Sequence, residues 1–368
     1  MAEFVGRGLH LGPGATFTSV SGVQVVDHYG APEDEYKSLT AAAGVLDLNG
    51  RGRICLLGTD RTRFLHGQVT NNIQDLAVGQ GCYAALVTAK GKLESDLNIY
   101  CLKDELLLDF EPGLTAKVMR RLESYIIADD VQAIDASPHY GLLSVQGPNS
   151  AEVLACAIPE LPRPTAPLAI THVPRSGGTG EIYCVDHRRG RAVGFDLFVP
   201  NDALAEIAER LLRFAREAGG GPCGWRALEM ARIEAGVPRF GADMDETNLA
   251  PETGIDARAI SYNKGCYIGQ EVIARIRTYG QVAKALRGLV LPPALPALPV
   301  RGQPLSREGR EVGYFTSAIV SPAFHRPIAL GYVRRECNEP GTELTWKSDQ
   351  GEVAAQVVAL PFALAPSS

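Results

Sequence analysis

The sequence has 368 residues, of which 45% are hydrophobic and 21% charged, and its formal net charge is −6. This composition is typical of a folded chain with two or three domains, and its acidic balance gives no general attraction to nucleic acid or to anionic membranes. No apolar run approaches the roughly 20 residues of a membrane helix, and the opening MAEFVGRGLHLGPGATF lacks the apolar core of a secretory signal. We therefore expect a cytoplasmic protein that does not contact membranes.

The eight cysteines show no metal-binding pattern. No two of them form a C-x-x-C pair, and no His-x-x-x-His cluster accompanies them. Neither a structural zinc site nor a self-contained iron–sulfur cluster is therefore expected, and we predict no resident metal. Most of the cysteines lie in apolar runs such as RICLLG and NIYCL, where a buried thiol acts as a small hydrophobic side chain.

Runs rich in β-branched or alternating apolar residues predict strands. They cover residues 53–58, 83–89, 97–102, 105–110, 141–146 and 194–199. Helical spacing of apolar residues predicts helices within TDRTRFLHGQV, LTAKVMRRLESYI and NDALAEIAERLLRFAREAGGG. The first of these helices has Thr59 or Asp60 as its cap, and the glycine run 219–221 ends the last.

Strands and helices are interspersed without the regular βα alternation of a doubly wound sheet, and no G-x-G-x-x-G follows a strand, so a dinucleotide-binding fold is not supported. The segment GLVLPPALPALPVRGQP contains prolines that fit neither a helix interior nor a central strand. The short strands and turns after it predict a small all-β unit. We therefore expect an α+β region over residues 1–288 and a β domain over residues 289–368.

One cysteine has a different setting from the others. It lies in KGCYIGQEVIARI, residues 264–276, where apolar residues recur at helix spacing from Ile268 to Ile276. Cys266 would thus precede the first helical turn, where unpaired N–H groups, the helix dipole and Lys264 favour a thiolate. A thiolate is a nucleophile, a soft metal ligand and a redox-sensitive group. The alternative is a thiol that only packs in the turn, and the pattern alone does not decide between the two.

KGCYIGQE resembles the K-G-C-Y-x-G-Q-E motif of the YgfZ-type folate-binding proteins, which belong to the larger family of the glycine-cleavage T-protein, an aminomethyltransferase. Further blocks resemble that family: GVLDLNGRGRICLLGTDRTRFLHGQVTNNI, GQGCYAALVTAKGKLESDLNIY, LLSVQGPNSAEVL and ARIEAGVPRFGADMDETNLAPE. The resemblance implies an α+β fold in which three subdomains form a GcvT-like cloverleaf around a central folate cavity, followed by a small C-terminal β-barrel. It also implies tetrahydrofolate, or a one-carbon derivative of it, as the cofactor.

Family members place a carboxylate near the folate in a G-x-x-x-D-D-L turn, which here reads GKLESDL, residues 91–97. Only Asp96 survives of the two acids, and Ser95 takes the other position. In T-proteins an aspartate of this turn assists transfer of the aminomethyl carbon, so transfer should be weak or absent if Ser95 occupies the catalytic position. The alternative for Asp96 is an ordinary turn carboxylate.

Arg232, in MARIEAG, matches the family arginine near the folate, and its guanidinium suits the carboxylates of the folate tail. Pairing with Glu229 or Glu234 on a helix surface is the alternative. Around Cys266, basic residues outnumber acidic ones, which indicates a local anion site such as one for a polyglutamyl tail, unless they form a solvated helix face.

The remaining candidates follow from the same resemblance. Asp196, in GFD, is the candidate acid of a stretch that is poorly preserved here, after an insertion-like run. Tyr267 and Gln270, within KGCYIGQE, are further candidates for cofactor binding. Cys266 and Lys264 are the candidate catalytic residues.

The resemblance points first to a tetrahydrofolate-binding factor that helps to assemble or repair 4Fe–4S clusters, with Cys266 as the working thiol. Its partners would be iron–sulfur proteins or their assembly machinery, and any effect on tRNA modification would be indirect. A folate-dependent aminomethyltransferase of the glycine cleavage system is the alternative, although the altered acidic turn and the cysteine motif count against it. A third possibility is a non-catalytic folate-binding scaffold, so whether the chain is an enzyme stays open. Direct nucleic-acid binding is not expected, because the sequence has no basic domain.

Overall fold

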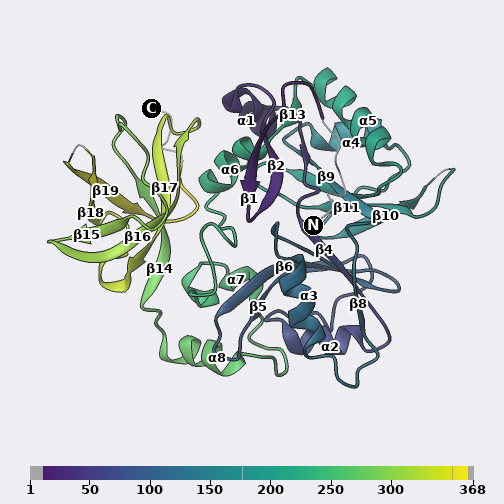
Figure 1. Cartoon of the computed structure of the whole chain (residues 1–368), viewed down its shortest axis with the longest axis horizontal. Helices are drawn as coiled ribbons and strands as arrows, with labels where there is room; N and C mark the ends of the chain where they lie inside the picture. Colours follow the sequence, from purple (N-terminus) through teal and green to yellow (C-terminus); the bar gives the residue numbers. More distant parts are fainter. Residues whose placement is uncertain (1–10, 176, 350, 364–368) are drawn as a thin grey trace.

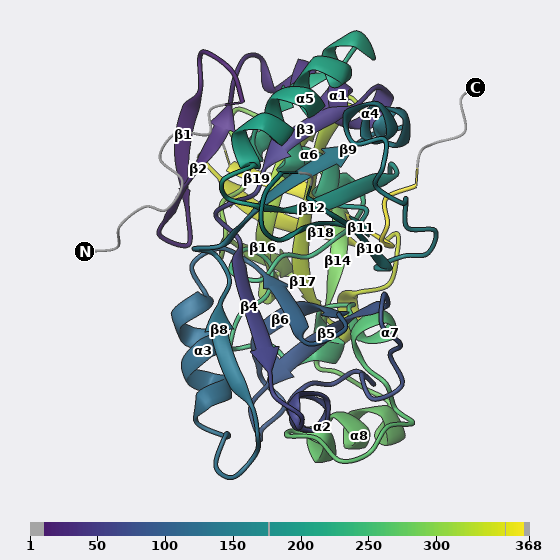
Figure 2. The same cartoon turned by 90° about the vertical axis from the view of Figure 1, so that its right-hand side faces the viewer.

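The computed structural model describes residues 11–363 apart from 176 and 350. Its main parts are a six-stranded sheet, a five-stranded sheet and a closed six-stranded barrel. In Figure 1 the barrel lies on the left and the two sheets lie one above the other on the right. Figure 2, turned by 90°, shows the two sheets in front of the barrel. None of the helices in the described ranges is long and apolar enough to span a membrane.

The six-stranded sheet has the order β10-β11-β12-β9-β3-β13. Its strands are β3 (Gly44–Asp47), β9 (Tyr140–Gln146), β10 (Ile170–Pro174), β11 (Glu181–Asp186), β12 (Gly194–Pro200) and β13 (Gly221–Cys223). Helices α4 (Ser150–Ala157) and α5 (Leu204–Glu217) pack on one face. The apolar stripe predicted for α5 is buried there, because it is the only wide apolar face of that helix. Strand β12 is buried over its whole length and therefore has neighbours on both faces.

The five-stranded sheet has the order β5-β6-β7-β4-β8 and is antiparallel. Its strands are β4 (Gly52–Leu57), β5 (Gly81–Val87), β6 (Leu93–Cys101), β7 (Leu106–Phe110) and β8 (Gln132–Asp135). Helices α2 (Arg61–Gln68) and α3 (Thr115–Glu123) share its outer core. Both helices were expected. In α3, Val118 and Leu122 are buried, whereas Tyr125 lies beyond the helix end and is largely exposed.

A third group of segments joins the sheets to the barrel. It comprises the hairpin β1 (Thr16–Val20) and β2 (Val23–His28), with α1 (Pro32–Ala41), α6 (Trp225–Glu234), η1 (Ala250–Glu252), α7 (Asp256–Ala259) and α8 (Gln270–Tyr279). Helix α6 contacts α1, β2 and the barrel strand β16 (Arg310–Ser321), so it is buried nearly all round. Helix α8 ends at Gly280, whose left-handed conformation is typical of a glycine after a helix, and Ile273 is its one buried residue.

The barrel closes in the order β14-β17-β16-β15-β18-β19. Besides β16 it contains β14 (Lys284–Val290), β15 (Pro304–Arg307), β17 (Arg326–Arg334), β18 (Glu343–Ser348) and β19 (Gly351–Val358), with the short η2 (Arg335–Cys337). The boundary predicted at 288/289 falls inside β14, which begins at Lys284. The proline-rich run did not mark the boundary, because it forms the long connection between β14 and β15 within the barrel. The expected fold class, an α+β cloverleaf followed by a small β-barrel, is confirmed.

Candidate functional site

The two sheets turn their inner faces toward each other, and strand alternation decides which side chains lie there. In β6, Leu97 and Ile99 join the outer core with the helices, so Asp96 and Asn98 point to the inner side. In β12, Phe195, Leu197 and Val199 contribute to the helix-side core, which leaves Asp196 facing inward. Polar residues at alternate positions of otherwise apolar strands therefore meet between the sheets.

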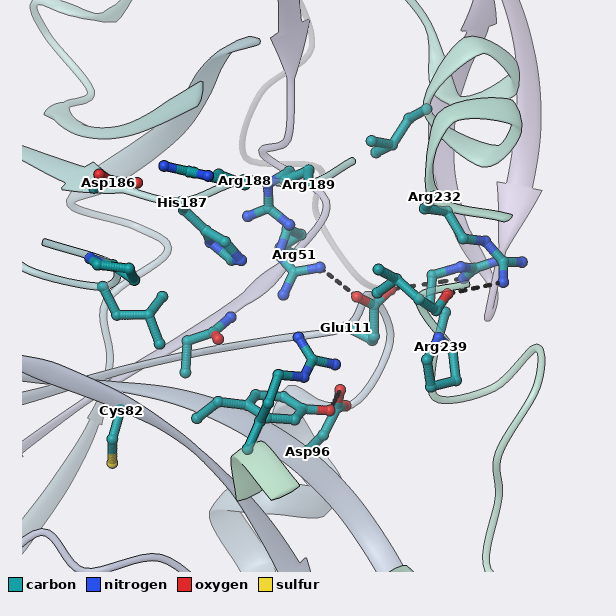
Figure 3. Close-up of a pocket in the computed structure, with 18 of the residues that line it drawn as sticks. Arg51, Cys82, Asp96, Glu111, Asp186, His187, Arg188, Arg189, Arg232 and Arg239 are labelled. Carbon is teal, nitrogen blue, oxygen red and sulfur yellow. Dashed lines mark hydrogen bonds and ion pairs between the residues drawn. The ribbon is translucent and has the colours of Figure 1, made fainter. Parts of the chain in front are cut away.

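A cavity of about 450 Å³ lies at this junction. The five-stranded sheet, the segment after β11, helix α6 and the loop after it all contribute to its wall. Figure 3 shows charged side chains converging on it from these elements. Such a volume is within the range of small-molecule sites, and the aromatic rings of Tyr83 and Trp225 provide flat apolar surface beside the charges.

Most of these charges are joined in one chain of ion pairs. Arg51 binds Asp109 with both its Nε and Nη2 atoms, at 2.8 and 3.0 Å, and also binds Glu111. Glu111 faces Arg239 at 3.6 Å, and Arg239 in turn binds Glu229 at 3.0 Å. Buried charges persist only when they are paired in this way. These linked ion pairs therefore fix the cavity wall, and few of the charged groups in them remain available to a ligand.

Arg232 belongs to the same network of ion pairs. Its guanidinium binds Glu229 at 2.7 Å, Asp243, and the Ser317 hydroxyl of the barrel at 2.8 Å. Burial opposes the charge of Glu229, but Arg232 and Arg239 outweigh it and lower the pKa of Glu229 to about 2. Arg232 lines the cavity, while most of its hydrogen-bonding capacity is used by protein groups. The ion pair between Arg232 and Glu229, which was the alternative considered for the sequence, does form. It lies in a buried position and not on an exposed helix surface.

Asp96 is a cavity acid with spare hydrogen-bonding capacity, as are Asp186 and Glu111 in the part of the chain that the structure describes. Asp96 Oδ2 accepts a hydrogen bond from the Tyr83 hydroxyl at 2.8 Å, while Oδ1 is buried without a partner among the described residues. Burial, and then the charge of Glu111, raise the pKa of Asp96 from 3.8 to about 6. Ser95 is fully buried on the other face of β6, and Glu94 binds Arg121. The change from acid to serine therefore falls on a residue that does not face the cavity, and the acidic turn still presents one carboxylate to it.

Asp196 lies behind the cavity wall. It is fully buried, and its two oxygens accept hydrogen bonds from Arg189 at 3.1 and 2.6 Å and from His187 Nδ1 at 2.9 Å. Burial opposes its charge, but Arg189 and His187 hold the pKa of Asp196 well below its usual range. A ligand in the cavity would meet His187 and Arg189 before it met Asp196, because those two line the cavity and Asp196 does not.

Asp109, His187 and Asp196 offer ligand atoms that lie within 4.8 Å of one another, close enough to share a metal ion. Their carboxylates are already neutralised by Arg51 and Arg189. A cation placed among them would face two guanidinium groups, so the donor set fits an ion-pair cluster better than a metal site.

Cys266 is solvent-exposed, as expected for a working thiol, but it does not line the cavity. It lies four positions before the first residue of α8, with the left-handed Gly269 between them, and so does not sit directly at the helix end. Lys264 is buried, and its ammonium donates to the carbonyl oxygens of His66, Val69 and Asn71 at 2.5, 2.7 and 3.0 Å. Burial lowers the pKa of Lys264 to about 8.

The rest of the KGCYIGQE motif also lies outside the cavity. Tyr267 is buried in the core between β5 and the 240–273 segment, with its ring 4.8 Å from the Lys264 ammonium. Gln270 is the first residue of α8. The motif nevertheless adjoins the cavity, since the carbonyl of Asn71 binds Lys264 and Asn71 is one of the residues of the cavity wall.

Several cavity residues were not singled out from the sequence. They are Arg51, Glu111, His187, Arg189 and Arg239. The one available signal was the charged run DHRRGR, residues 186–191, between two strands. This run resembled an insertion in the sequence. Nothing in the local pattern showed that the turn it forms lines a cavity.

Two family models match the chain. The GCVT N-terminal domain matches residues 8–264, and the glycine cleavage T-protein C-terminal barrel domain matches residues 284–363. The chain belongs to the glycine cleavage T-protein family. The folds agree as well. A crystal structure of the glycine cleavage system aminomethyltransferase T from Bartonella henselae superposes with a TM-score of 0.85 and 24% identity, covering 95% of this chain and 94% of that one.

Relatives of this T-protein family member carry the name aminomethyltransferase. The protein from Halothermothrix orenii is 26% identical over 96% of this chain and 98% of its own length. That from Streptomyces avermitilis is 28% identical over 96% and 95%, respectively. Identities at this level establish shared ancestry and fold, and they leave the reaction to be argued from the site.

Proposed function

We propose that the protein binds tetrahydrofolate, or a one-carbon derivative, in the central cavity and acts on its one-carbon group as a transferase of the aminomethyltransferase type. The observation that carries this proposal is the free Oδ1 of Asp96. A buried carboxylate oxygen without a partner is costly, and the ring N–H groups of a pterin would satisfy it. The raised pKa of Asp96 also suits a group that exchanges protons near neutral pH.

The rest of the cavity supports a folate. Tyr83 and Trp225 contribute aromatic rings to the wall, and the guanidinium groups of Arg258 and Arg239 lie over them at 5.2 and 5.0 Å from the ring centres. Arg188 and Arg258 are exposed at the cavity, and among the described residues neither forms an ion pair. These two cations could bind the carboxylates of the folate tail. Folate supplies the nitrogen atoms that carry the one-carbon group, while the protein orients it and supplies the carboxylate.

Isothermal titration with 5-formyltetrahydrofolate, a stable folate, tests the proposal, with Asp96→Asn as the main variant. Asp104→Asn is a matched control, because Asp104 is exposed and outside the cavity. We expect wild type and Asp104→Asn to bind alike, and Asp96→Asn to bind at least tenfold more weakly, about the 1.4 kcal/mol of one good hydrogen bond to a charged group. Equal binding by all three proteins would remove the proposal's basis.

A second candidate function rests on the exposed thiol of Cys266: assistance in assembling or repairing 4Fe–4S clusters, as in the YgfZ branch. The thiol lies on a loop that Lys264 fixes to the cavity wall through Asn71, so folate binding and thiol chemistry could be coupled. One cysteine cannot hold a cluster, so the role would be transient and shared with partner iron–sulfur proteins or their assembly machinery. Effects on tRNA modification would then be indirect, and the setting would be the cytoplasm.

The two candidates differ in what cysteine removal does. In cells lacking the protein, the activity of 4Fe–4S enzymes after oxidative stress would be compared for wild type, Cys266→Ala and Cys156→Ala. Cys156 is also exposed and lies on α4, so it controls for loss of a surface thiol. Loss of function with Cys266→Ala alone supports the iron–sulfur role. If both variants keep full function and the protein catalyses folate-dependent transfer in vitro, only the transferase function remains supported.

A further inference from the structure

His187 is a titratable group at the cavity that the T-protein resemblance does not assign. It follows β11, in the turn DHRRGR that leads to β12. Its Nδ1 lies 2.9 Å from Asp196 Oδ2, and its backbone carbonyl accepts a hydrogen bond from Gln146 at 2.9 Å. The ring lines the cavity, and Figure 3 shows it pointing toward the cavity's middle.

The hydrogen bond determines the tautomer of the ring. Asp196 is ionised, since Arg189 and His187 hold its pKa low, and an ionised carboxylate can only accept. The proton of a neutral His187 is therefore on Nδ1, which leaves the lone pair of Nε2 open to the cavity. Nε2 has no hydrogen-bond partner among the described residues and is not sealed from solvent.

Neighbouring side chains hold Asp196 against the Nδ1 side of the His187 ring. Arg189 holds Asp196 through two hydrogen bonds, so the carboxylate cannot turn away from the ring. Charged groups near the imidazole come from its own turn, from β12 of the same sheet, and from the facing five-stranded sheet with the residue before β4. They are Asp186, Arg188, Arg189, Asp196, Arg51 and Asp109.

We propose that His187, oriented by Asp196, is an acid–base residue, separate from Asp96, that exchanges a proton with the ligand bound in the cavity. An imidazole with a buried carboxylate on Nδ1 and a free Nε2 is the arrangement by which enzymes hold a general base in one tautomer and stabilise its protonated form. The inference rests on the proposed folate function and adds a residue to it.

A folate nitrogen forms its bond to the one-carbon group with its lone pair while the leaving group departs with the electron pair of its own bond to that carbon. His187 Nε2 takes the proton that the nitrogen then loses, and the N–H electron pair stays on nitrogen. The imidazolium, stabilised by Asp196, afterwards gives this proton to the departed group. Neither an oxidant nor a reductant is required.

The decisive variant is His187→Asn. The asparagine amide can replace Nδ1 as the donor to Asp196 but has nothing at the place of Nε2, so a purely structural histidine would be replaced with little loss. His139→Asn is the matched control, because His139 is exposed and distant from the cavity lining. His187→Gly, assayed with and without added imidazole, tests whether a free base can replace the missing ring.

For folate-dependent one-carbon transfer we expect His187→Asn to lower kcat by about 10²- to 10⁴-fold with the folate Kd within threefold of wild type. Its pH–rate profile should lose the limb attributable to a histidine, and imidazole should restore part of the rate of His187→Gly. A kcat for His187→Asn within twofold of wild type, or a kcat loss with an unchanged pH profile and no rescue, would overturn the assignment.

A second readout does not need turnover and separates this inference from the proposed function. In ¹⁵N NMR of the labelled protein, His187 should be the Nδ1–H tautomer, and 5-formyltetrahydrofolate should shift its ring ¹⁵N resonances, whereas Asp196→Asn should change the tautomer. If wild type shows no transfer, the transferase function fails. A ligand-induced shift at His187 then still supports the acid–base contact, and an unmoved His187 overturns it.

Discussion

Asp96→Asn should make the protein more stable while it weakens folate binding. The substitution keeps the size of the side chain and an oxygen for the Tyr83 hydroxyl, and it removes a charge that burial and Glu111 disfavour. The raised pKa of Asp96 means that the charged form of this carboxyl is less favourable in the folded protein than in the unfolded chain. Residues at functional sites are often kept at such a cost to stability.

The size of the gain follows from the pKa. Each pKa unit between folded and unfolded protein corresponds to about 1.4 kcal/mol, so a rise from 3.8 to about 6 corresponds to roughly 3 kcal/mol at most. Asp96 is half-buried, so solvent screening should reduce the observed gain to about 1–3 kcal/mol. Between about pH 4 and pH 6 the folded protein keeps a proton that the unfolded chain releases, so wild-type stability falls as the pH rises through this window.

Guanidinium denaturation followed by circular dichroism at several pH values from 4 to 8 measures the effect, with Asp104→Asn as control. The difference between Asp96→Asn and wild type should be near zero at pH 4 and reach its full value above pH 6. A variant that is less stable than wild type at pH 8, or a gain that is the same at pH 4 and pH 8, would show that the carboxylate is not strained by its surroundings.

Three further variants test the other parts of the site. Arg232→Gln breaks a buried ion pair with Asp243 and should lower the free energy of unfolding by about 3–5 kcal/mol, measured by the same denaturation; a loss below 1 kcal/mol would contradict the assigned network. Lys264→Met leaves three carbonyl oxygens without their donor and should cost about 2–4 kcal/mol, whereas an unchanged midpoint would mean that water replaces the ammonium. Cys266→Ala alters an exposed side chain and should change stability by less than about 0.5 kcal/mol, with the folate Kd unchanged; a larger change in either would show that the thiol is structural.

Local sequence patterns were sufficient for the elements whose burial has a regular period. The stripe of α5 and the pair Val118 and Leu122 of α3 are buried as their spacing indicated, because a single apolar face determines how such a helix packs. Helix α6 gave no such signal, since it lies between the sheets and the barrel and is buried nearly all round. The hairpin β1–β2 is short and half-exposed, so its alternation is weak.

The site could be predicted only where a local motif coincides with it. Asp96 was found through its turn, and Arg232 through its helix segment, and both line the cavity. The sequence could not show that Arg232 binds Asp243, or that His187 and Arg189 cover Asp196. These pairs form between residues 7 to 11 positions apart, across irregular turns whose path the local pattern does not determine. The motif around Cys266 was easily recognised, but the spacing of residues in the sequence could not show that Cys266 lies outside the cavity lining.

A crystal structure with 5-formyltetrahydrofolate bound tests the central claim most directly. The pterin should occupy the cavity between the two sheets, with a ring N–H within hydrogen-bonding distance of Asp96 Oδ1 and the His187 ring facing the ligand. Folate bound elsewhere on the molecule, or a pterin in the cavity with Asp96 Oδ1 still unpartnered, would contradict the assignment of this cavity as the one-carbon site.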